Sequence, residues 1–219
     1  MNILITGANR GIGLTLTEIY QKFGHNVFAT CRKPSLELEK TGANVITEID
    51  VTNLSSLKRL SEKLGQQKID ILINNAGVLF KDDFNHLNYE EITKQFEVNT
   101  LGPLKVAEAL VKNLSANAKM GILTSRMGSI EDNTSGGMYG YRLSKAAANA
   151  VGKSLSLDLK DQNIAVAILH PGFVQTEMTG GMGNIDSHTA AHGLIEVMDK
   201  VTLENTGQFW HSNGSKLPW

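Results

Sequence analysis

The sequence has little cysteine, no excess of charge and no long apolar run, and each absence narrows the class of protein. Cys31 is the only cysteine in 219 residues, so no disulfide can form within the chain. Lysine and arginine total 21 and aspartate and glutamate 22, a formal net charge of −1. This balance lacks the basic surface of nucleic-acid binders and favours a small-molecule partner. Without a membrane-length apolar run or a signal-peptide pattern, we expect a cytoplasmic protein that binds no membrane.

Short β-rich segments alternate with longer segments of helical periodicity. Most of the β-rich segments are continuous apolar runs, as expected for strands that helices cover on both faces of a parallel sheet. The expected strands are Asn2–Thr6, Asn26–Thr30, Asn44–Ile49, Ile69–Asn74, Met120–Ser125, Ile164–Leu169 and Gln208–His211. The expected helices are Gly13–Phe23, Asn53–Leu64, Tyr89–Leu114, Tyr141–Leu159 and His188–Val201. The pattern predicts a single α/β domain over residues 1–219, doubly wound and Rossmann-type, with a mainly parallel seven-stranded sheet flanked by helices.

A glycine-containing turn, T-G-A-N-R-G-I-G at residues 6–13, joins the first expected strand to a helix. Glycine at such a turn lets the backbone approach a pyrophosphate, and the helix N-terminus offers unpaired N–H groups to it. The glycine spacing differs from G-x-G-x-x-G, but the strand–turn–helix context favours dinucleotide binding over a plain turn. The loop residues expected to bind the cofactor are Gly7, Asn9, Arg10, Gly11, Ile12 and Gly13.

The residues after the second expected strand indicate which nicotinamide cofactor is bound. An NAD site usually has an acidic residue about 20 residues after the glycine turn, where it bonds the ribose 2′-hydroxyl. This sequence has C-R-K at residues 31–33 instead. A guanidinium can pair with a 2′-phosphate, so Arg32, with Arg10 from the other side, favours NADP(H) over NAD(H). The alternative is that both arginines are solvated surface charges.

Two further strand ends belong to the same expected site. Asp50 and Val51 follow the third strand, where the carboxylate could accept a hydrogen bond from adenine. Asn74 ends the fourth strand, and Asn75, Ala76 and Gly77 follow it with small side chains that allow close backbone approach. Ligands of open α/β sheets bind at the carboxyl ends of the strands, where these segments lie.

Tyr141 and Lys145 stand at positions i and i+4 at the start of an expected helix, and so on one face of it. Free tyrosine titrates near pH ~10, and a neighbouring ammonium favours the phenolate. A tyrosine tuned in this way can give a proton to the alkoxide that forms when hydride reaches a carbonyl carbon. Tyr139 lacks this partner, because Leu143 stands at its i+4 position. A Tyr–Lys pair alone often lies on an exposed helix surface without a catalytic role. The hypothesis that Tyr141 is a proton donor therefore depends on the cofactor loop upstream.

Taken in order along the chain, these segments resemble the short-chain dehydrogenase/reductase family. The motifs that carry the resemblance are Thr6-Gly7-x-x-x-Gly11-x-Gly13, Asn74-Asn75-Ala76-Gly77, Asn99, the serine-bearing strand end, Tyr141-x-x-x-Lys145 and Pro171-Gly172. The resemblance implies a catalytic tetrad of Asn99, Ser125, Tyr141 and Lys145. In it, Ser125 bonds the substrate oxygen, Lys145 also holds the nicotinamide ribose with Tyr141 beside it, and Asn99 positions a water that relays protons toward Lys145.

The resemblance also assigns the segment from His170 onward to the nicotinamide. Pro171, Gly172, Val174 and Thr176 are the implied cofactor residues, with the Val174 backbone and the Thr176 hydroxyl meeting the carboxamide. The Gly-rich stretch after them predicts a mobile substrate loop near residues 177–187.

The catalytic serine departs from the family pattern. The usual spacing selects Ser129, twelve residues before Tyr141, whereas Ser125 lies sixteen residues before it. We favour Ser125 because it closes an apolar strand, where a side chain is held rigidly, and because loop 130–137 can accommodate the extra residues.

A nearer resemblance is to the short sniffer-type carbonyl reductases and C-factor-like proteins, through T-S-R-M-G-S-I at 124–130 and the ending L-P-W. It implies an NADPH-dependent enzyme that moves hydride between the nicotinamide and an aldehyde or ketone, with Tyr141 as proton donor. The alternative is an NADP(H)-binding sensor or signalling protein with little catalytic role.

Two expectations concern other sites. His188, His192 and Glu196 share a helix face, but no further ligand is near in sequence, so we expect a solvated face and no metal. Small residues after Tyr141 and an apolar stripe through Phe96, Leu104 and Leu110 favour a homodimer or homotetramer. The alternative is that these faces pack only against the chain's own sheet.

Overall fold

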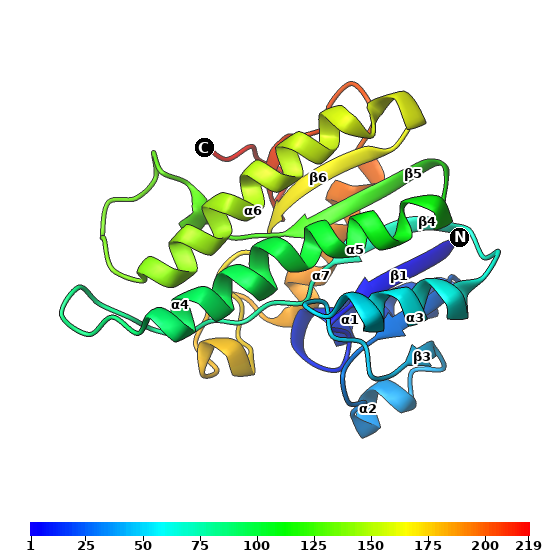
Figure 1. The fold of residues 1–219 in the computed structure, drawn as a ribbon, viewed down its shortest axis with the longest axis horizontal. Coiled ribbons are helices and arrows are strands. Elements are labelled where there is room, and N and C mark those ends of the chain that lie inside the picture. The colour runs from blue at the N-terminus through cyan, green and yellow to red at the C-terminus, as the bar shows by residue number, and fades with distance from the viewer.

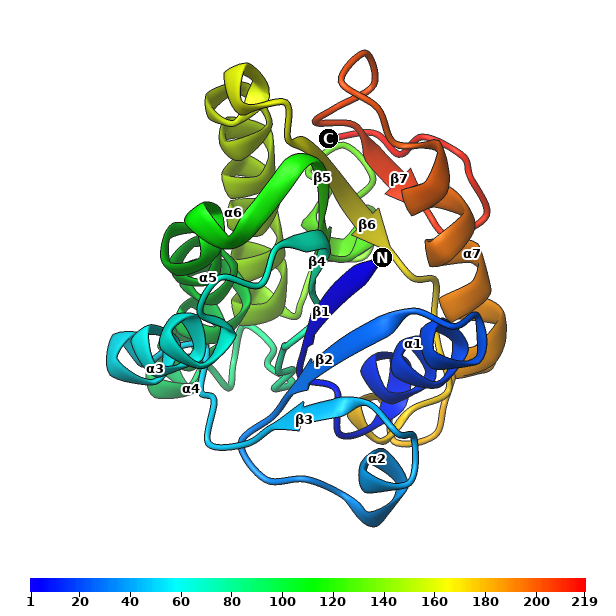
Figure 2. The same cartoon turned by 90° about the vertical axis from the view of Figure 1, so that its right-hand side faces the viewer.

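A twisted sheet of seven parallel strands runs through the computed structural model, which describes residues 1–219 (Figures 1 and 2). The strands are β1 (Asn2–Thr6), β2 (Asn26–Thr30), β3 (Asn44–Ile46), β4 (Ile69–Asn74), β5 (Leu114–Leu123), β6 (Ala165–His170) and β7 (Phe209–His211). Their order is β3-β2-β1-β4-β5-β6-β7, and every neighbouring pair is parallel. The predicted fold class is therefore confirmed. The order reverses between β1 and β4, the place where ligands bind in sheets of this kind.

Helices cover both faces of the sheet, as Figure 2 shows. They are α1 (Gly11–Lys22), α2 (Leu36–Glu39), α3 (Leu54–Leu64), α4 (Tyr89–Phe96), α5 (Gly102–Leu110), α6 (Tyr139–Asp158) and α7 (Ser187–Lys200). α1 and α7 pack together on one face, and α3, α5 and α6 lie on the other with α4 alongside α6. None of these helices combines the length and the apolar character needed to cross a bilayer.

The two-sided cover explains the continuous apolar runs of the sequence. Successive side chains of a strand point to opposite faces. Ile3 and Ile5 of β1 belong to the core under α1 and α7, whereas Leu4 belongs to the core under α3 and α5. All three side chains are fully buried, so none of these three successive positions calls for a polar residue.

The long helix predicted over Tyr89–Leu114 is wrong. α4 ends at Phe96, a π-helical turn η1 follows over Glu97–Leu101, and α5 begins at Gly102. Pro103 has no N–H for a carbonyl one turn earlier, which favours an irregular turn before it. The last predicted residue, Leu114, instead opens β5, which ends at Leu123 rather than at Ser125.

β3 is also shorter than the predicted Asn44–Ile49. Glu48 has a φ of 61°, a left-handed conformation that interrupts an extended strand. The chain nevertheless stays beside β2, because the Ile49 N–H donates to the carbonyl of Cys31 at 3.0 Å. Asp50 and Val51 therefore still reach the carboxyl edge of the sheet.

Candidate active site

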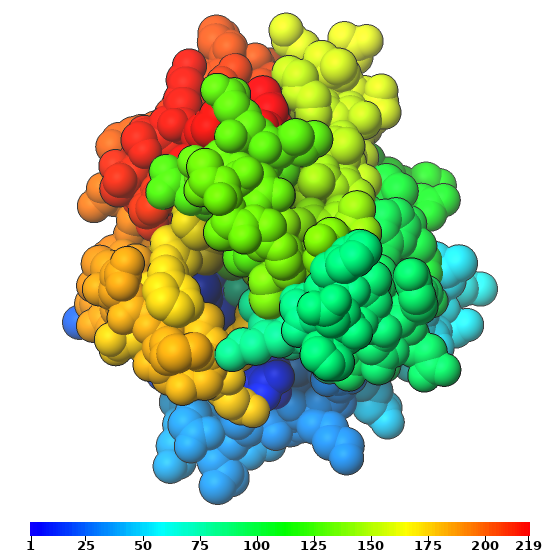
Figure 3. All heavy atoms as spheres, turned by 90° about the vertical axis from the view of Figure 1, so that its left-hand side faces the viewer, coloured from blue at the N-terminus to red at the C-terminus, as the bar shows by residue number.

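The carboxyl ends of the strands enclose one cleft, visible in Figure 3 as a hollow framed by yellow-to-orange and green segments. The predicted site residues that line it are Gly7, Asn9, Arg10, Gly11, Ile12, Arg32, Asp50, Val51, Asn75, Ala76, Gly77, Tyr141, Lys145, Pro171 and Thr176. Predicted residues outside the lining are Gly13, Asn99, Ser125, Gly172 and Val174. The structure thus brings segments from six strand ends to a single cavity.

The glycine turn brings bare backbone to the floor of the cleft. Gly7 has a φ of 66°, and a Cβ there would lie 2.8 Å from the Cα of Ala76, so only glycine fits. Gly13 faces away from the cleft, where a Cβ would overlap the Asn75 amide. No side chain caps the N-terminus of α1, which begins at Gly11. The N–H groups of this first turn therefore suit an anionic ligand such as a pyrophosphate.

The two arginines differ in what they bind. Arg10 forms an ion pair with Glu177 of the 3₁₀ turn η5 (Glu177–Thr179), with 2.6 Å between Nη1 and Oε1. Arg32 is exposed and forms no ion pair with any residue of the chain. Burial raises the pKa of the nearby Asp50, but hydrogen bonds from Thr52 and the charges of Arg32 and Lys94 outweigh it, so the pKa is lowered. Of the two arginines that line the cleft, only Arg32 therefore has a guanidinium without an ion-pair partner.

Tyr141 and Lys145 point into the deep end of the cleft from α6. The Lys145 Nζ lies 5.6 Å from the centre of the Tyr141 ring and donates to the carbonyl of Leu123 at 2.9 Å. Burial raises the pKa of Tyr141 to about 12, opposed by the Ser125 side chain. Burial lowers the pKa of Lys145 to about 8. Contrary to the expected preference for phenolate, the tyrosine holds its proton at neutral pH, as a proton donor must.

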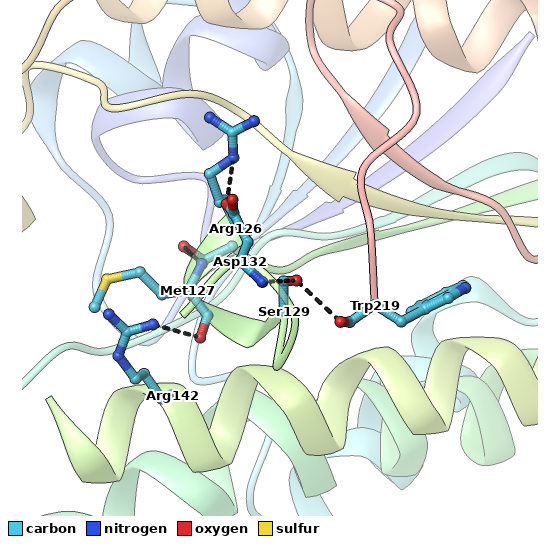
Figure 4. A network of polar contacts seen from close by, with 7 residues as sticks. Arg126, Met127, Ser129, Asp132, Arg142 and Trp219 are labelled. Carbon is cyan, nitrogen blue, oxygen red and sulfur yellow. Dashed lines mark hydrogen bonds and ion pairs between the residues drawn. The ribbon is translucent and has the colours of Figure 1, made fainter. Parts of the chain in front are cut away.

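The two candidate serines occupy different environments. The Ser125 hydroxyl accepts from the Met127 N–H at 3.1 Å and is close enough to the Tyr141 phenol to influence its pKa. Ser129 is bonded to other parts of the chain, as Figure 4 shows: its hydroxyl donates to the main-chain oxygen of Trp219 at 3.0 Å and accepts from the Asp132 N–H. Ser125 does not close β5 as expected; it caps the 3₁₀ turn η3 (Arg126–Gly128). It is nevertheless the serine beside Tyr141.

Asn99 is buried in η1 next to the Tyr–Lys pair. Its Nδ2 donates to the Val78 carbonyl at 2.9 Å and to the Ser144 hydroxyl at 3.0 Å, and its Oδ1 accepts from the Val78 N–H at 2.8 Å. A Cβ on Gly77 would lie 3.2 Å from Asn99 Oδ1 and 3.8 Å from Lys145 Nζ. The amide therefore stands behind Gly77, with its polar atoms engaged by the protein.

The segment after β6 bends back across the cleft. Thr176 lines the cavity, while Val174 is buried and pairs with Ile185. The Thr179 hydroxyl donates to the Val174 carbonyl at 2.9 Å, whereas the Val174 N–H makes no hydrogen bond within the chain. This N–H therefore has no partner within the chain.

Sequence reasoning missed several residues of the cleft. Cys31, Lys94 and Glu97 line it without belonging to any motif. Cys31 directly precedes Arg32 at a strand end, a position that could have marked it. Lys94 and Glu97 come from α4 and η1, where only tertiary packing brings them to the cleft. No group of three histidine, cysteine, aspartate or glutamate side chains in residues 1–219 is arranged to hold a metal ion.

Known proteins with similar sequences carry two kinds of name. The chain is 41% identical over 223 residues to the 1-hydroxy-2-glutathionyl-2-methyl-3-butene dehydrogenase of Rhodococcus sp. (strain AD45), with 99% of each chain covered. It is 38% identical over 154 residues to the C-signal of Myxococcus xanthus, covering 69% of this chain and 93% of that protein. The first name denotes a dehydrogenase, which agrees with a tyrosine-centred cleft.

Several solved structures of similar fold are named carbonyl reductases. The carbonyl reductase Sniffer of D. melanogaster matches with a TM-score of 0.92 and 33% identity, over 100% of this chain and 99% of that one. An NADPH-bound carbonyl reductase from chicken fatty liver matches with a TM-score of 0.91 and 27% identity, over 100% and 98%. These likenesses confirm the predicted resemblance to the sniffer-type branch.

The family model described as short chain dehydrogenase matches residues 1–184, which hold the glycine turn, the Tyr–Lys pair and the segment after β6. With the strand order, the cleft and the relatives in agreement, this chain belongs to the short-chain dehydrogenase/reductase family of NAD(P)-dependent oxidoreductases and is carbonyl reductase-like.

Proposed function

We propose that the chain is an NADPH-dependent oxidoreductase that interconverts an aldehyde or ketone with its alcohol, with Tyr141 as the proton donor for reduction. The observation that carries the proposal is the placement of three side chains at the deep end of one cleft. The Tyr141 phenol, with its pKa raised to about 12, is close to the Ser125 side chain, and the Lys145 Nζ lies 5.6 Å from the centre of the Tyr141 ring. A protonated donor beside a hydroxyl that can hold the substrate oxygen is what carbonyl reduction requires.

The cleft fits a nicotinamide dinucleotide phosphate. The uncapped start of α1 and the Gly7 backbone would hold the pyrophosphate, and Arg32 would hold the 2′-phosphate. Asp50 and Val51 would border the adenine. The free Val174 N–H and the Thr176 hydroxyl would meet the carboxamide.

The bound nicotinamide would supply or accept the hydride, while the protein's own groups manage the substrate oxygen and its proton. Tyr141 would donate the proton in reduction and accept it in alcohol oxidation. Ser125 would hold the substrate oxygen, and Lys145, charged below about pH 8, would stabilise negative charge on the phenol oxygen. Asn99, which lies behind Gly77, would position a water molecule that relays protons toward Lys145.

Turnover across a carbonyl panel tests the proposal, with NADPH absorbance as the readout and NADH run in parallel. The panel should include aliphatic and aromatic aldehydes and ketones and, in the oxidative direction, an alcohol with an adjacent glutathionyl thioether, because a 41% identical relative is named for such a compound. We expect turnover of at least one class with NADPH preferred. An inert protein that still binds NADPH would contradict the enzymatic proposal.

A second candidate is a signalling or sensing role, which the likeness to the C-signal favours. A sensor needs the glycine turn and Arg32 but has no use for Asn99, Ser125, Tyr141 and Lys145 together. The buried Tyr–Lys pair therefore supports catalysis first. A Tyr141→Phe variant that binds NADPH but has lost turnover would separate the two roles in any assay of signalling.

A further inference from the structure

The chain after β4 is tied to the neighbouring helices at every second residue. We call it the 78–82 segment. Val78 is bonded through both its N–H and its carbonyl to the Asn99 side chain, at 2.8 and 2.9 Å. The Phe80 N–H donates to Gln95 Oε1 at 3.0 Å. The third tie is made by Asp82, and it reaches the helix that carries Tyr141.

Asp82 binds three successive N–H groups at the start of α6. Its main-chain oxygen accepts from Met138 at 3.0 Å, its Oδ1 accepts from Tyr139, and its Oδ2 accepts from Gly140 at 2.8 Å. These groups have no partner within the helix, and an anion there also interacts favourably with the helix dipole. A carboxylate more than fifty residues away thus does what an N-cap residue ordinarily does.

The helix supplies no cap of its own. Its N-cap residue is Met138, which has no side-chain cap bond and a left-handed φ of 54°. The two preceding glycines, Gly136 and Gly137, also have positive φ values. Arg142 of α6 binds this connection through the Gly137 carbonyl and the Ser135 hydroxyl, but the N–H groups of residues 138–140 are bound by Asp82.

The contact also requires a close approach immediately before Tyr141. A Cβ on Gly140 would overlap Gln95 Nε2 and would lie 3.1 Å from Asp82 Oδ2. Gln95 is fully buried and holds Phe80 at the same time. The 78–82 segment is therefore held between α4 and the first turn of α6.

We propose that Asp82 is a positioning residue, which fixes the first turn of α6 and so the Tyr141 phenol against the cleft wall formed by Gly77 and Val78. This inference rests on the proposed function, because it takes Tyr141 to be the group that transfers the proton. Displacing a catalytic group by about 1 Å can lower the rate on the order of 100-fold. Loss of the cap should therefore lower kcat and leave intact the cofactor contacts proposed for the glycine turn and Arg32, which lie outside α6.

The test compares Asp82→Leu and Asp82→Asn with Asp83→Leu and Asp83→Asn. Asp83 is the matched control: its carboxylate accepts from the Asn85 N–H at 2.8 Å and lies 3.1 Å from His86 Nδ1, and it makes no hydrogen bond to α6. We expect kcat of Asp82→Leu to fall about 10- to 100-fold with KM for NADPH within about twofold. Asp82→Asn, which keeps an acceptor, should recover most of the rate, and both Asp83 variants should match wild type.

Amide hydrogen exchange gives a second readout that does not depend on turnover. The N–H groups of Tyr139 and Gly140 should exchange faster in the Asp82 variants than in wild type, and at the wild-type rate in the Asp83 variants. Faster exchange with an unchanged kcat would overturn the positioning role, and unchanged exchange would overturn the cap itself. If Asp82→Leu does not fold, the comparison of Asp82→Asn with Asp83→Asn decides. A wild type inert on every carbonyl would overturn the proposed function and the positioning role, while exchange would still decide the cap.

Discussion

Replacing Arg32 by alanine should weaken NADPH binding and leave NADH binding almost unchanged. Arg32 is exposed at the cleft and forms no ion pair, so it can bind a 2′-phosphate without breaking another contact. A hydrogen bond to a charged group contributes about 1.5–3 kcal/mol. Since about 1.4 kcal/mol corresponds to a tenfold change, the dissociation constant for NADPH should rise roughly 10- to 100-fold.

Arg10 provides the matched comparison, because Glu177 already binds its guanidinium at 2.6 Å. To reach a phosphate, Arg10 has to leave this partner, so Arg10→Ala should weaken NADPH binding less than Arg32→Ala does. Glu177→Gln removes the competing carboxylate. Exposed ion pairs contribute about 0–1 kcal/mol, so this change should strengthen NADPH binding by at most about fivefold.

The assay is a fluorescence titration of each variant with NADPH and with NADH at fixed ionic strength. Arg32→Asp is the strongest variant, because it places a carboxylate where NAD-binding members of the fold carry one. Its NADPH/NADH preference should reverse. Equal weakening of both cofactors by Arg32→Ala, or an unchanged preference in Arg32→Asp, would refute the assignment of Arg32 to the 2′-phosphate.

Three further predictions follow from the site and the helix surfaces. Ser125→Ala should lower kcat about 100-fold. Ser129→Ala loses its hydrogen bonds with Trp219 and Asp132, so it should lower the melting temperature and leave kcat unchanged. The opposite pattern in steady-state kinetics would contradict the choice of serine. For reduction, kcat/KM should decline above about pH 8 because Lys145 loses its charge there, whereas Tyr141 stays protonated until about pH 12. The decline should be absent from the pH profile of Lys145→Arg. A decline that persists in this variant would refute the assignment to Lys145. We also expect a homodimer or homotetramer, in which association would cover Leu157 of α6, now 61% exposed. Light scattering should show wild type above the mass of a monomer and Leu157→Glu shifted toward it. A monomeric wild type would contradict the prediction.

Much of the fold could be predicted because burial on both faces leaves a strong pattern in each strand. β1, β2 and β4 have the predicted bounds, since the apolar residues at the centre of each strand admit few alternatives. The failures lie where one residue overrides the pattern. The π-helical turn before Pro103 interrupts a helical periodicity that continues on both sides of it, and Glu48 ends β3 through its φ angle rather than its polarity.

The site could be predicted where its chemistry is local in sequence. The glycine turn is contiguous with α1, and Tyr141 and Lys145 share one helical face, so spacing alone brings their groups together. Asp82 could not be found in this way, because the N–H groups that it caps are more than fifty residues away. For the serine, the family spacing alone favours Ser129, but the position near the end of an apolar strand favoured Ser125, and Ser125 is the serine beside the Tyr141 phenol although β5 ends at Leu123.

Turnover of Tyr141→Phe tests the central claim most directly. The change keeps the ring packed under Lys145 and removes only the transferable proton. General acid catalysis contributes about 10²–10⁴-fold, so turnover of a good carbonyl substrate should fall by at least 100-fold while NADPH affinity by fluorescence stays near the wild-type value. Tyr139→Phe is the control, because its ring lies 38% exposed against Phe84 and has no lysine one turn later. If Tyr141→Phe reduces the substrate at close to the wild-type rate, Tyr141 is not the proton donor and the account is wrong.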